Sequence, residues 1–485
     1  MTKLYLEKRD CLSYPYPDDF YSPHVFYPEY PFPKETISSR QNEVYDMVRA
    51  SLFGLGLDKE NYGKGSWNPI GDYVKPKSRI LIKPNFVNHS NPVGGLDCTV
   101  THPSIIRCII DYCVIAKAEI IEIGDAPIQN CDFQELMNVH GYSRMFGFFN
   151  EKGIKLKITD FRKTISKSLP FNLLLQQKST DKEETIEFDL KSLSYFKNLP
   201  DTHEYQYGIA NYYDKNINTN HNRENHKYLV TKSIIDADLI INLPKPKTHR
   251  FAGITGAQKN FIGICSDKEY LPHYRTGTAQ NGGDETNHFS KLDKCLSLFN
   301  QKRCKYIEKQ NLPLQLLYIF LITFVRKFRN LLNKNNFYSS GQWHGNDTIW
   351  RTVLDLNLIL LYGNSKGILN INQVPARNIL TVGDIIIAGE KSGPLTPEPK
   401  PLGIILASDN CAAFDYVFCK MTGFDFEKIP SVRYSINNSY LLKDSLETIN
   451  FNSNINEYNT TVLPDIIFPT SWNFEPNPAW DEVLK

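Results

Sequence analysis

Three short apolar runs, each ending in polar residues, are the clearest pattern in the sequence. They occupy residues 79–83, 118–123 and 237–242. Between the first two, residues 103–118 repeat apolar side chains at helical spacing, including Ile105, Ile106, Ile109 and Ile110. Buried strands that alternate with helices are typical of a parallel sheet. The pattern predicts an α/β fold, a mostly parallel sheet with flanking helices that is elaborated by insertions.

The same criteria predict further elements along the chain. Helical spacing marks residues 35–57, 312–332 and 412–421, and short strands are expected at 154–158, 185–190, 379–382, 385–388 and 402–407.

The distribution of prolines and polar residues predicts the domain organisation. Residues 13–33 alternate aromatic residues with prolines, which exclude a regular helix and favour an extended path. We therefore expect an extended N-terminal strap at 1–34, an α/β core at 35–430 and a C-terminal extension at 431–485. Within the core, 151–232 and 300–350 read as insertions.

Polar side chains follow each of the three apolar runs. Lys83 and Asn85 close the first run, Asp125 follows the second, and Asn242 closes the third. Because the carboxyl ends of parallel strands form one edge of such a sheet, these residues are expected to converge on one site. The alternative for Asp125 is a turn that simply ends its strand.

The densest chemical motif lies at residues 242–273, in NLPKPKTH, TGAQKNFIGI and His273. Lys245, Lys247 and Lys259 supply positive charge, and the glycines allow backbone N–H groups to approach an anion. His249 and His273 can move a proton or bind a metal. The motif predicts an anion-binding site, with a solvated basic loop as the alternative.

Two further segments carry candidate residues. Pro103 suits the first turn of a helix, so Thr101 or His102 is expected to cap it, and His102 is expected to lie beside a bound ligand at this helix start. Asp384 and Glu390 lie in DIIIAGEKSGP, where carboxylates facing lysines could serve acid–base chemistry or hold a divalent metal. A structural network of ion pairs is the alternative.

Composition and missing motifs narrow the functional classes. The 55 Lys and Arg residues nearly balance the 53 Asp and Glu residues, which argues against a nucleic-acid binder. The ten cysteines form no CxxC pair, so we expect no cysteine-ligated Fe–S cluster. Neither an NAD motif nor an ATP motif is present, and GxSxG is also missing. The first residues lack a secretory apolar run, so a cytoplasmic protein is expected.

The chain carries an ordered set of short motifs: IKPN, THPS, IGDAP, INLPKPKTH, TGAQKNFIG with His273, DIIIAGEKSGP and SDNCAAFD. Taken in this order, they resemble the DUF362 family, which is named for its undefined function. The resemblance implies functional roles for Lys83, Asn85, Asp125, Lys245, Lys247, His249, Lys259, Asn260, Asp384 and Glu390. Many relatives carry two ferredoxin-like [4Fe–4S] motifs, which are missing here. Ile385 and Lys391 replace the family's usual glycines.

We expect an enzyme that acts on an anionic small molecule, a phosphorylated or carboxylated sugar or a hydroxy acid, in a biosynthetic pathway. Proton transfer by Lys, His and carboxylate groups, with or without a divalent metal, is favoured over hydrolysis. The expected catalytic residues are Lys259, His249, His273 and Asp125. The expected substrate-binding residues are Lys83, Asn85, His102, Asn242, Lys245, Lys247 and Asn260, and the metal ligands are Asp384 and Glu390.

Two alternatives to an enzyme remain open. One is a non-catalytic accessory protein that handles a metal or a cofactor. The other is a membrane-surface complex subunit, because the predicted helix 312–332 has an apolar stripe and ends in basic residues. Peripheral membrane contact or a dimer contact through this helix is therefore expected.

Overall fold

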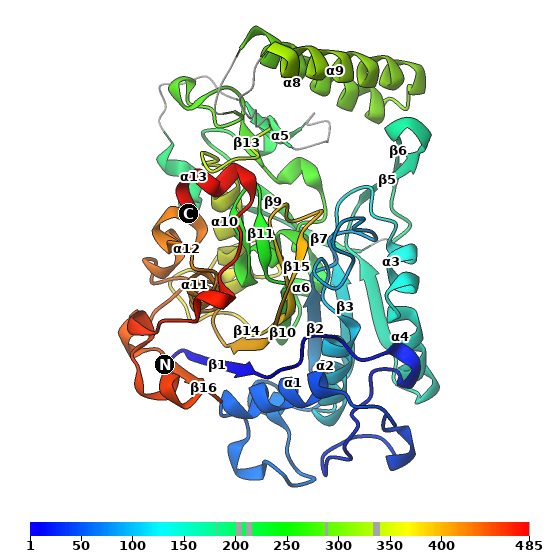
Figure 1. Cartoon of the computed structure of the whole chain (residues 1–485), viewed down its shortest axis with the longest axis vertical. Coiled ribbons are helices and arrows are strands. Elements are labelled where there is room, and N and C mark those ends of the chain that lie inside the picture. Colours follow the sequence, from blue (N-terminus) through cyan, green and yellow to red (C-terminus); the bar gives the residue numbers. More distant parts are fainter. Residues whose placement is uncertain (182, 200–205, 210–215, 287–289, 333–339, 485) are drawn as a thin grey trace.

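The fold is built around one large mixed sheet. The computed structural model describes residues 1–181, 183–199, 206–209, 216–286, 290–332 and 340–484. Within them, a ten-stranded sheet has the main order β16-β1-β15-β14-β10-β2-β3-β4, with β11 and β12 attached beside β14 (Figure 1). The predicted α/β class, a mostly parallel sheet with flanking helices, is confirmed.

The centre of the sheet is parallel. It contains β14 (Asn378–Glu390), β10 (Leu239–Leu243), β2 (Arg79–Pro84), β3 (Ile120–Asp125) and β4 (Leu156–Asp160). The three apolar runs of the sequence are the neighbouring strands β10, β2 and β3.

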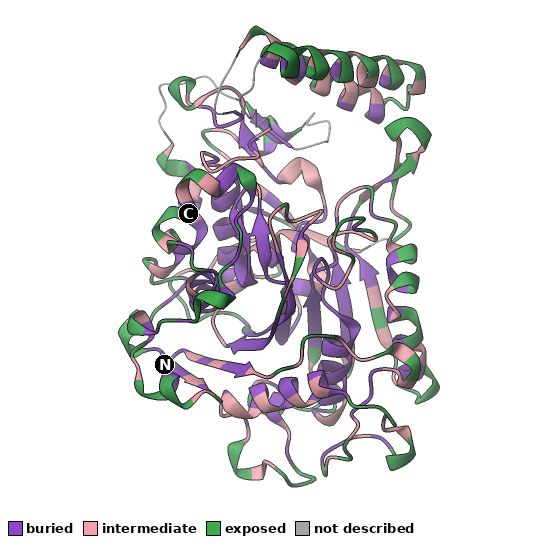
Figure 2. Ribbon diagram, in the orientation of Figure 1, coloured by how far each residue is buried: buried purple, intermediate pink, exposed green. Residues whose placement is uncertain are grey.

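Alternate residues of these strands enter two different hydrophobic clusters. Ile80 and Ile82 pack in one cluster with helices α1 (Glu43–Gly54) and α2 (Pro103–Ile115). Leu81 packs in the other, with α10 (Ile349–Tyr362) and α11 (Cys411–Thr422). Because side chains alternate across a strand, the sheet is buried on both faces, as the purple ribbon of Figure 2 shows.

Several element boundaries differ from the predicted ones for local reasons. Helix α1 begins later than residue 35, because the Asn42 side chain accepts a hydrogen bond from Tyr45 N and caps it there. The predicted strands 379–382 and 385–388 are one strand, β14, with a bulge between Ile385 and Ile387. It pairs with β15 (Glu398–Ser408) in the antiparallel sense, which an apolar run alone does not indicate.

Both ends of the chain contribute strands to the sheet. β1 (Lys3–Lys8) lies between β15 and β16 (Asn450–Ser453). Residues 1–34 are therefore not wholly a surface strap, since alternate side chains of β1, Leu4 and Leu6, are buried in the core. The following aromatic segment packs on α2, with the Tyr14 ring stacked on His102 at 3.9 Å.

The segments predicted to be insertions form elements at the edges of the core. The predicted strand at 185–190 is β7 (Thr185–Asp189). A β5–β6 hairpin (Thr164–Leu169, Leu173–Lys178) reaches towards the helices α8 (Lys291–Glu308) and α9 (Leu312–Leu332), which lie at one end of the long axis (Figure 1). Among the described helices, none has the length and hydrophobicity to cross a bilayer.

The remaining described strands and helices are short. They are α3 (Phe133–Val139), α4 (Tyr142–Glu151), β8 (Tyr207–Gly208), α5 (Ile217–Asn220), β9 (Lys227–Thr231), α6 (Lys232–Ile235), β11 (Lys247–His249), β12 (Gly253–Thr255), α7 (Ala257–Asn260), β13 (Tyr274–Arg275), α12 (Pro430–Ile436) and α13 (Asp481–Leu484).

Candidate functional site

The carboxyl ends of β10, β2 and β3 lie side by side, and residues at the ends of β2 and β3 line a pocket. Its volume is about 580 Å³. Six of the residues expected at the site line it: Asn85, Asp125, His249, Lys259, Asn260 and His273. The β5–β6 hairpin and the inner side of α9 complete the wall. The edge of the sheet and two insertions therefore enclose one cavity.

Lys259 is the unusual side chain of this pocket. Burial, together with the nearby Lys268 ammonium, lowers the pKa of Lys259 to about 7. No described residue forms a hydrogen bond or an ion pair with its Nζ. An amine with a pKa near 7 is present at neutral pH in both its charged and its neutral form, as an acid–base catalyst requires.

The other charged residues of the pocket are mostly basic. Lys268, Arg250, Arg303 and Arg326 line it. Among the described residues, the buried Nε atoms of Arg250 and Arg303 find no hydrogen-bond partner. Burial lowers the pKa of Lys268 and of Arg250. Unpaired buried donors of this kind are rare and indicate a polar ligand or water.

Among the described lining residues, Asp125 is the one acidic group, and it is fully engaged. Its Oδ1 lies 2.7 Å from Lys83 Nζ, and its Oδ2 accepts from Phe86 N at 2.7 Å. A Cβ at Gly263 would lie 1.8 Å from Oδ1, so this glycine makes the close packing possible. Lys83 and Asp125 therefore neutralise each other, and Lys83 adds no free positive charge to the pocket.

Backbone contacts fix the two pocket histidines as opposite tautomers. His249 Nδ1 accepts from Phe251 N and Ala252 N, so its proton lies on Nε2. His273 Nδ1 contacts the carbonyl oxygen of Leu271 at 2.7 Å and must donate to it, which leaves a lone pair on Nε2. The pocket thus has one imidazole donor and one imidazole acceptor. Burial lowers the pKa of His273 to about 3 and that of His249 well below its usual range.

Two asparagines are oriented by residues behind the pocket wall. Lys247 Nζ donates to Asn85 Oδ1 at 2.5 Å. Asn260 Nδ2 donates to Asn242 Oδ1 at 2.8 Å, and Asn260 Oδ1 is buried without a hydrogen-bond partner in the part of the chain that the structure describes. Lys247 and Asn242 therefore position pocket residues and do not line the cavity themselves.

The sequence suggested that the glycine-rich loop offers backbone N–H groups to an anion, but two of these groups are already engaged within the protein. The amides of Ala257 and Gln258, at the start of α7, donate to the Asp415 carboxylate at 2.5 and 3.1 Å. A Cβ at Gly256 would lie 2.0 Å from Asp415 Oδ1. The glycine is needed because an internal carboxylate occupies this position.

Lys245, Asp384 and Glu390 lie outside the pocket. Lys245 Nζ is 3.0 Å from Asp384 Oδ2, and both side chains are fully buried with the Tyr14 hydroxyl. Glu390 Oε2 accepts from Glu475 N at 2.9 Å. The structure therefore separates Asp384 and Glu390, the expected metal ligands, into an internal ion pair and a surface contact.

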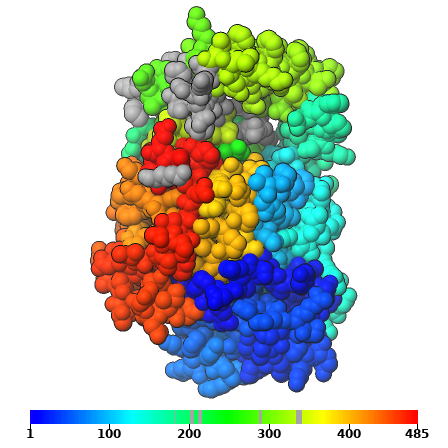
Figure 3. Space-filling view, in the orientation of Figure 1, coloured from blue at the N-terminus to red at the C-terminus, as the bar shows by residue number. Residues whose placement is uncertain are grey.

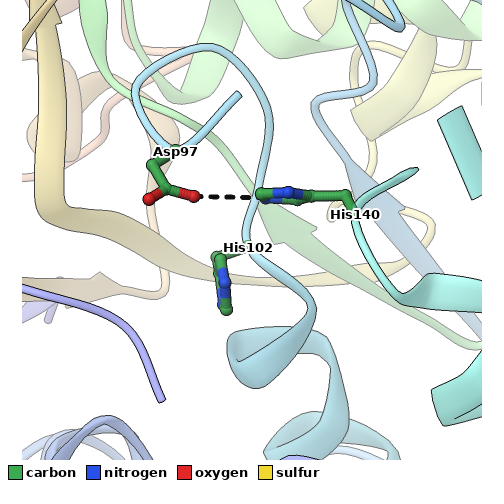
Figure 4. A group of neighbouring side chains, drawn as sticks. All are labelled: Asp97, His102 and His140. Atoms are coloured by element: carbon green, nitrogen blue, oxygen red, sulfur yellow. Dashed lines mark ion pairs between the residues drawn. The ribbon is translucent and has the colours of Figure 1, made fainter. Parts of the chain in front are cut away.

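His102 belongs to a second cluster, with Asp97 and His140 (Figure 4). Their potential ligand atoms all lie within 4.8 Å of one another, close enough for one metal ion. His140 Nε2 is 3.5 Å from Asp97 Oδ1. His102 also caps α2, as expected, because its Nδ1 accepts from Ser104 N at 3.2 Å.

Comparison with known proteins identifies the family. The sequence matches the family described as "Domain of unknown function (DUF362)" over residues 80–182 and 203–420. The chain belongs to the DUF362 family. Among curated proteins, no match was found.

One solved structure with a weak similarity is a protein from Thermotoga maritima. It shares 10% sequence identity, with a TM-score of 0.26, over 74% of this chain and 54% of that chain. This DUF362 chain thus spans about half the length of that protein, and a similarity this weak says nothing about the site.

Sequence reasoning missed several residues of this DUF362 site. Arg250 directly follows His249 and could have been included with the motif. Asp97 lies close in sequence to His102, which was already a candidate, and could have been considered with it. Arg303 and Arg326 come from α8 and α9, far along the chain from any motif, and no local pattern connects them to the pocket.

Proposed function

We propose that this DUF362 protein is an enzyme that transfers protons to and from an anionic small molecule bound in the 580 Å³ pocket. The observation that carries the proposal is Lys259, an amine with a pKa of about 7 and no described partner. Amines are tuned in this way by burial at catalytic sites.

The charge of the pocket supports an anionic substrate. Lys268, Arg250, Arg303 and Arg326 line the cavity, whereas its one described acidic residue, Asp125, is paired with Lys83. A phosphate or carboxylate would neutralise these cations and satisfy the unpaired guanidinium donors. Pockets of about this size take small molecules, such as a phosphorylated or carboxylated sugar or a hydroxy acid.

The two tautomers assign roles within the pocket. Neutral Lys259 accepts a proton from a substrate carbon and becomes an ammonium, while the electron pair stays on the substrate as an enolate-type anion. His249 Nε2–H donates a hydrogen bond to that developing charge. His273, with a pKa of about 3, is a much weaker base than Lys259, so its lone pair accepts a hydrogen bond from a substrate hydroxyl.

Hydrogen–deuterium exchange at substrate carbon tests the chemistry without knowledge of the product. The protein is incubated in D₂O with a panel of hydroxy acids and sugar phosphates, and the C–H signals are followed by NMR. We expect exchange in at least one compound, lost in Lys259→Met and retained in Lys232→Met, which changes an exposed lysine paired with Glu184. If sulfate binds the pocket but no panel member exchanges, the enzymatic proposal fails and anion binding alone remains.

A second candidate function is metal handling, which the Asp97, His102 and His140 cluster favours. A metal on His102 Nε2 requires the proton on Nδ1, which would then donate to Ser104 Oγ at 2.8 Å instead of capping α2. Loss of a helix cap costs about 1 kcal/mol, less than tenfold in affinity. Because metal binding would cost this cap, the affinity of a metal site at His102 is lowered, but metal binding is not prevented.

A further inference from the structure

Helix α9 exposes a continuous apolar stripe. Phe320 is 67% exposed, Phe324 61% and Leu331 84%. With Leu317 and Phe328, these residues recur every three or four positions and so share one side of the helix. Soluble proteins seldom expose contiguous apolar patches of this kind without a binding partner.

The stripe is turned outward because the opposite side of α9 is anchored. Arg329 Nε lies 2.8 Å from Asp293 of α8, and the Tyr318 ring stacks on Tyr306 at 5.6 Å. Gln315 exchanges two hydrogen bonds of 3.0 Å with the backbone of Leu174 in β6. The residues between these contacts, including Ile322, line the pocket. The orientation of the stripe is therefore fixed by packing.

The turn of the β5–β6 hairpin lies beside the two helices and adds one more exposed apolar side chain. Phe171 is 77% exposed, and the neighbouring Asn172 carbonyl accepts from Arg303 at 2.8 Å. Figure 3 shows this turn and the α8–α9 pair at the same end of the molecule. The apolar surface at this end therefore comes from two separate insertions.

The same helices carry a concentration of positive charge. Residues 291–332 contain nine Lys and Arg residues and two acidic residues, whereas the rest of the chain contains 46 basic and 51 acidic residues. Lys302, Lys309 and Lys327 are exposed. A basic helix with an aromatic and leucine face is the form that lies in the interface of an anionic membrane.

We propose that the α8–α9 helices seat this protein on an anionic lipid bilayer, with the α9 stripe inserted among the headgroups. A second copy of the chain is a less suitable partner for the α9 stripe than a bilayer is. A two-fold contact through the same face would bring together two helix pairs in which basic residues outnumber acidic ones nine to two, so their net positive charges would repel. On the bilayer, the lipid phosphates supply counter-charges, and the pocket on the other side of α9 lies close to the membrane.

Vesicle flotation of the full chain tests the proposal. We expect binding to vesicles of phosphatidylcholine with phosphatidylglycerol at low salt, and weak binding to phosphatidylcholine alone. The double variant Phe320→Asp with Phe324→Asp should reduce the bound fraction at least tenfold. Ile467→Asp, at a residue 86% exposed in the C-terminal extension, should leave it unchanged.

A charge variant tests the electrostatic part of the membrane contact. Sulfate affinity and light scattering then separate membrane binding from damage to the pocket and from dimer formation. Lys302→Glu with Lys309→Glu should also weaken binding, and sulfate affinity measured on each variant reports whether the pocket is intact. The proposal is overturned if the wild-type chain does not bind the mixed vesicles, or if neither double variant weakens binding. It is also overturned if light scattering finds a dimer that the phenylalanine variant dissociates. Vesicle binding without sulfate binding would support the membrane contact and contradict only the proposed enzyme.

Discussion

Lys247 Nζ donates to Asn85 Oδ1 at 2.5 Å, so the amide nitrogen of Asn85 is the end that faces the pocket. Two N–H donors are thereby offered to a bound anion. Asn85→Asp keeps the shape of the side chain but replaces these donors with a carboxylate oxygen. We expect the Kd for sulfate, measured by calorimetry, to rise at least about tenfold, because losing a hydrogen bond to a charged group costs about 1.5–3 kcal/mol.

The matched control is Asn378→Asp, which adds the same charge at an exposed position outside the pocket. Its sulfate affinity should equal that of the wild-type chain. Equal affinity for Asn85→Asp as well would mean that Asn85 does not contact the anion.

Lys259→Met should stabilise the fold while it weakens anion binding. In the unfolded chain a lysine has a pKa of about 10.4, whereas in the folded chain Lys259 has a pKa of about 7. Below pH 7 both states are charged, and the folded state carries the full cost of burying the ammonium. Between pH 7 and about 10.4 the unfolded chain holds more protons, so the contribution of this group to stability rises with pH.

The melting temperature of Lys259→Met should therefore exceed that of the wild-type chain by about 2 °C or more at pH 6, with a smaller difference at pH 9.5. Lys232→Met, which removes an exposed ion pair with Glu184, should give no such increase. A lower melting temperature for Lys259→Met at pH 6 would show that the amine has a stabilising contact.

The core of the fold could be predicted because its strands are continuous apolar runs with polar ends. Residues 79–83, 118–123 and 237–242 became neighbouring parallel strands, and the helix at 312–332 has the predicted bounds. The direction of a strand and the strands with which it pairs are not determined by its own residues. The antiparallel pairing of β15 and the place of β1 within the sheet depend on contacts between opposite ends of the chain.

The site could be predicted in outline, but the pairing of its charges could not. Sequence motifs indicated that Lys83 and Lys245 hold an anion, whereas the structure pairs them with Asp125 and Asp384. These partners lie on different strands, so only the fold shows which lysines keep an unpaired charge. Lys259 lines the pocket without a described ion-pair partner, because the pocket's one described carboxylate, Asp125, is already paired with Lys83.

Anion binding should be accompanied by proton uptake at alkaline pH. At pH 8 Lys259, with a pKa of about 7, is mostly neutral. A bound anion stabilises the ammonium and raises this pKa, so the complex takes up a proton from solution. Sulfate is the suitable ligand because it does not itself titrate near neutral pH.

Calorimetry in two buffers of different ionisation enthalpy measures this uptake. We expect uptake of part of a proton at pH 8, which leaves a neutral share of Lys259 in the complex, and almost none at pH 6, where Lys259 is already charged. In Lys259→Met the enthalpy should be the same in both buffers at pH 8. Uptake that persists in this variant would assign the titration to another group, such as Lys268.

The Asp97, His102 and His140 cluster predicts a single metal site of moderate affinity. Two imidazoles and one carboxylate suit Zn²⁺ or Co²⁺, and the fourth position would be open to water. We expect Co²⁺ titration to give the visible absorption of a tetrahedral site, with one ion bound per chain. His140→Asn should abolish that absorption, because two ligands alone do not fix a tetrahedral geometry. His89→Asn is the matched control, since His89 lies 3.6 Å from Glu135 in a separate histidine–carboxylate pair. If His89→Asn and His140→Asn reduce the signal equally, the ion binds at the surface, and the metal-handling function loses its structural basis.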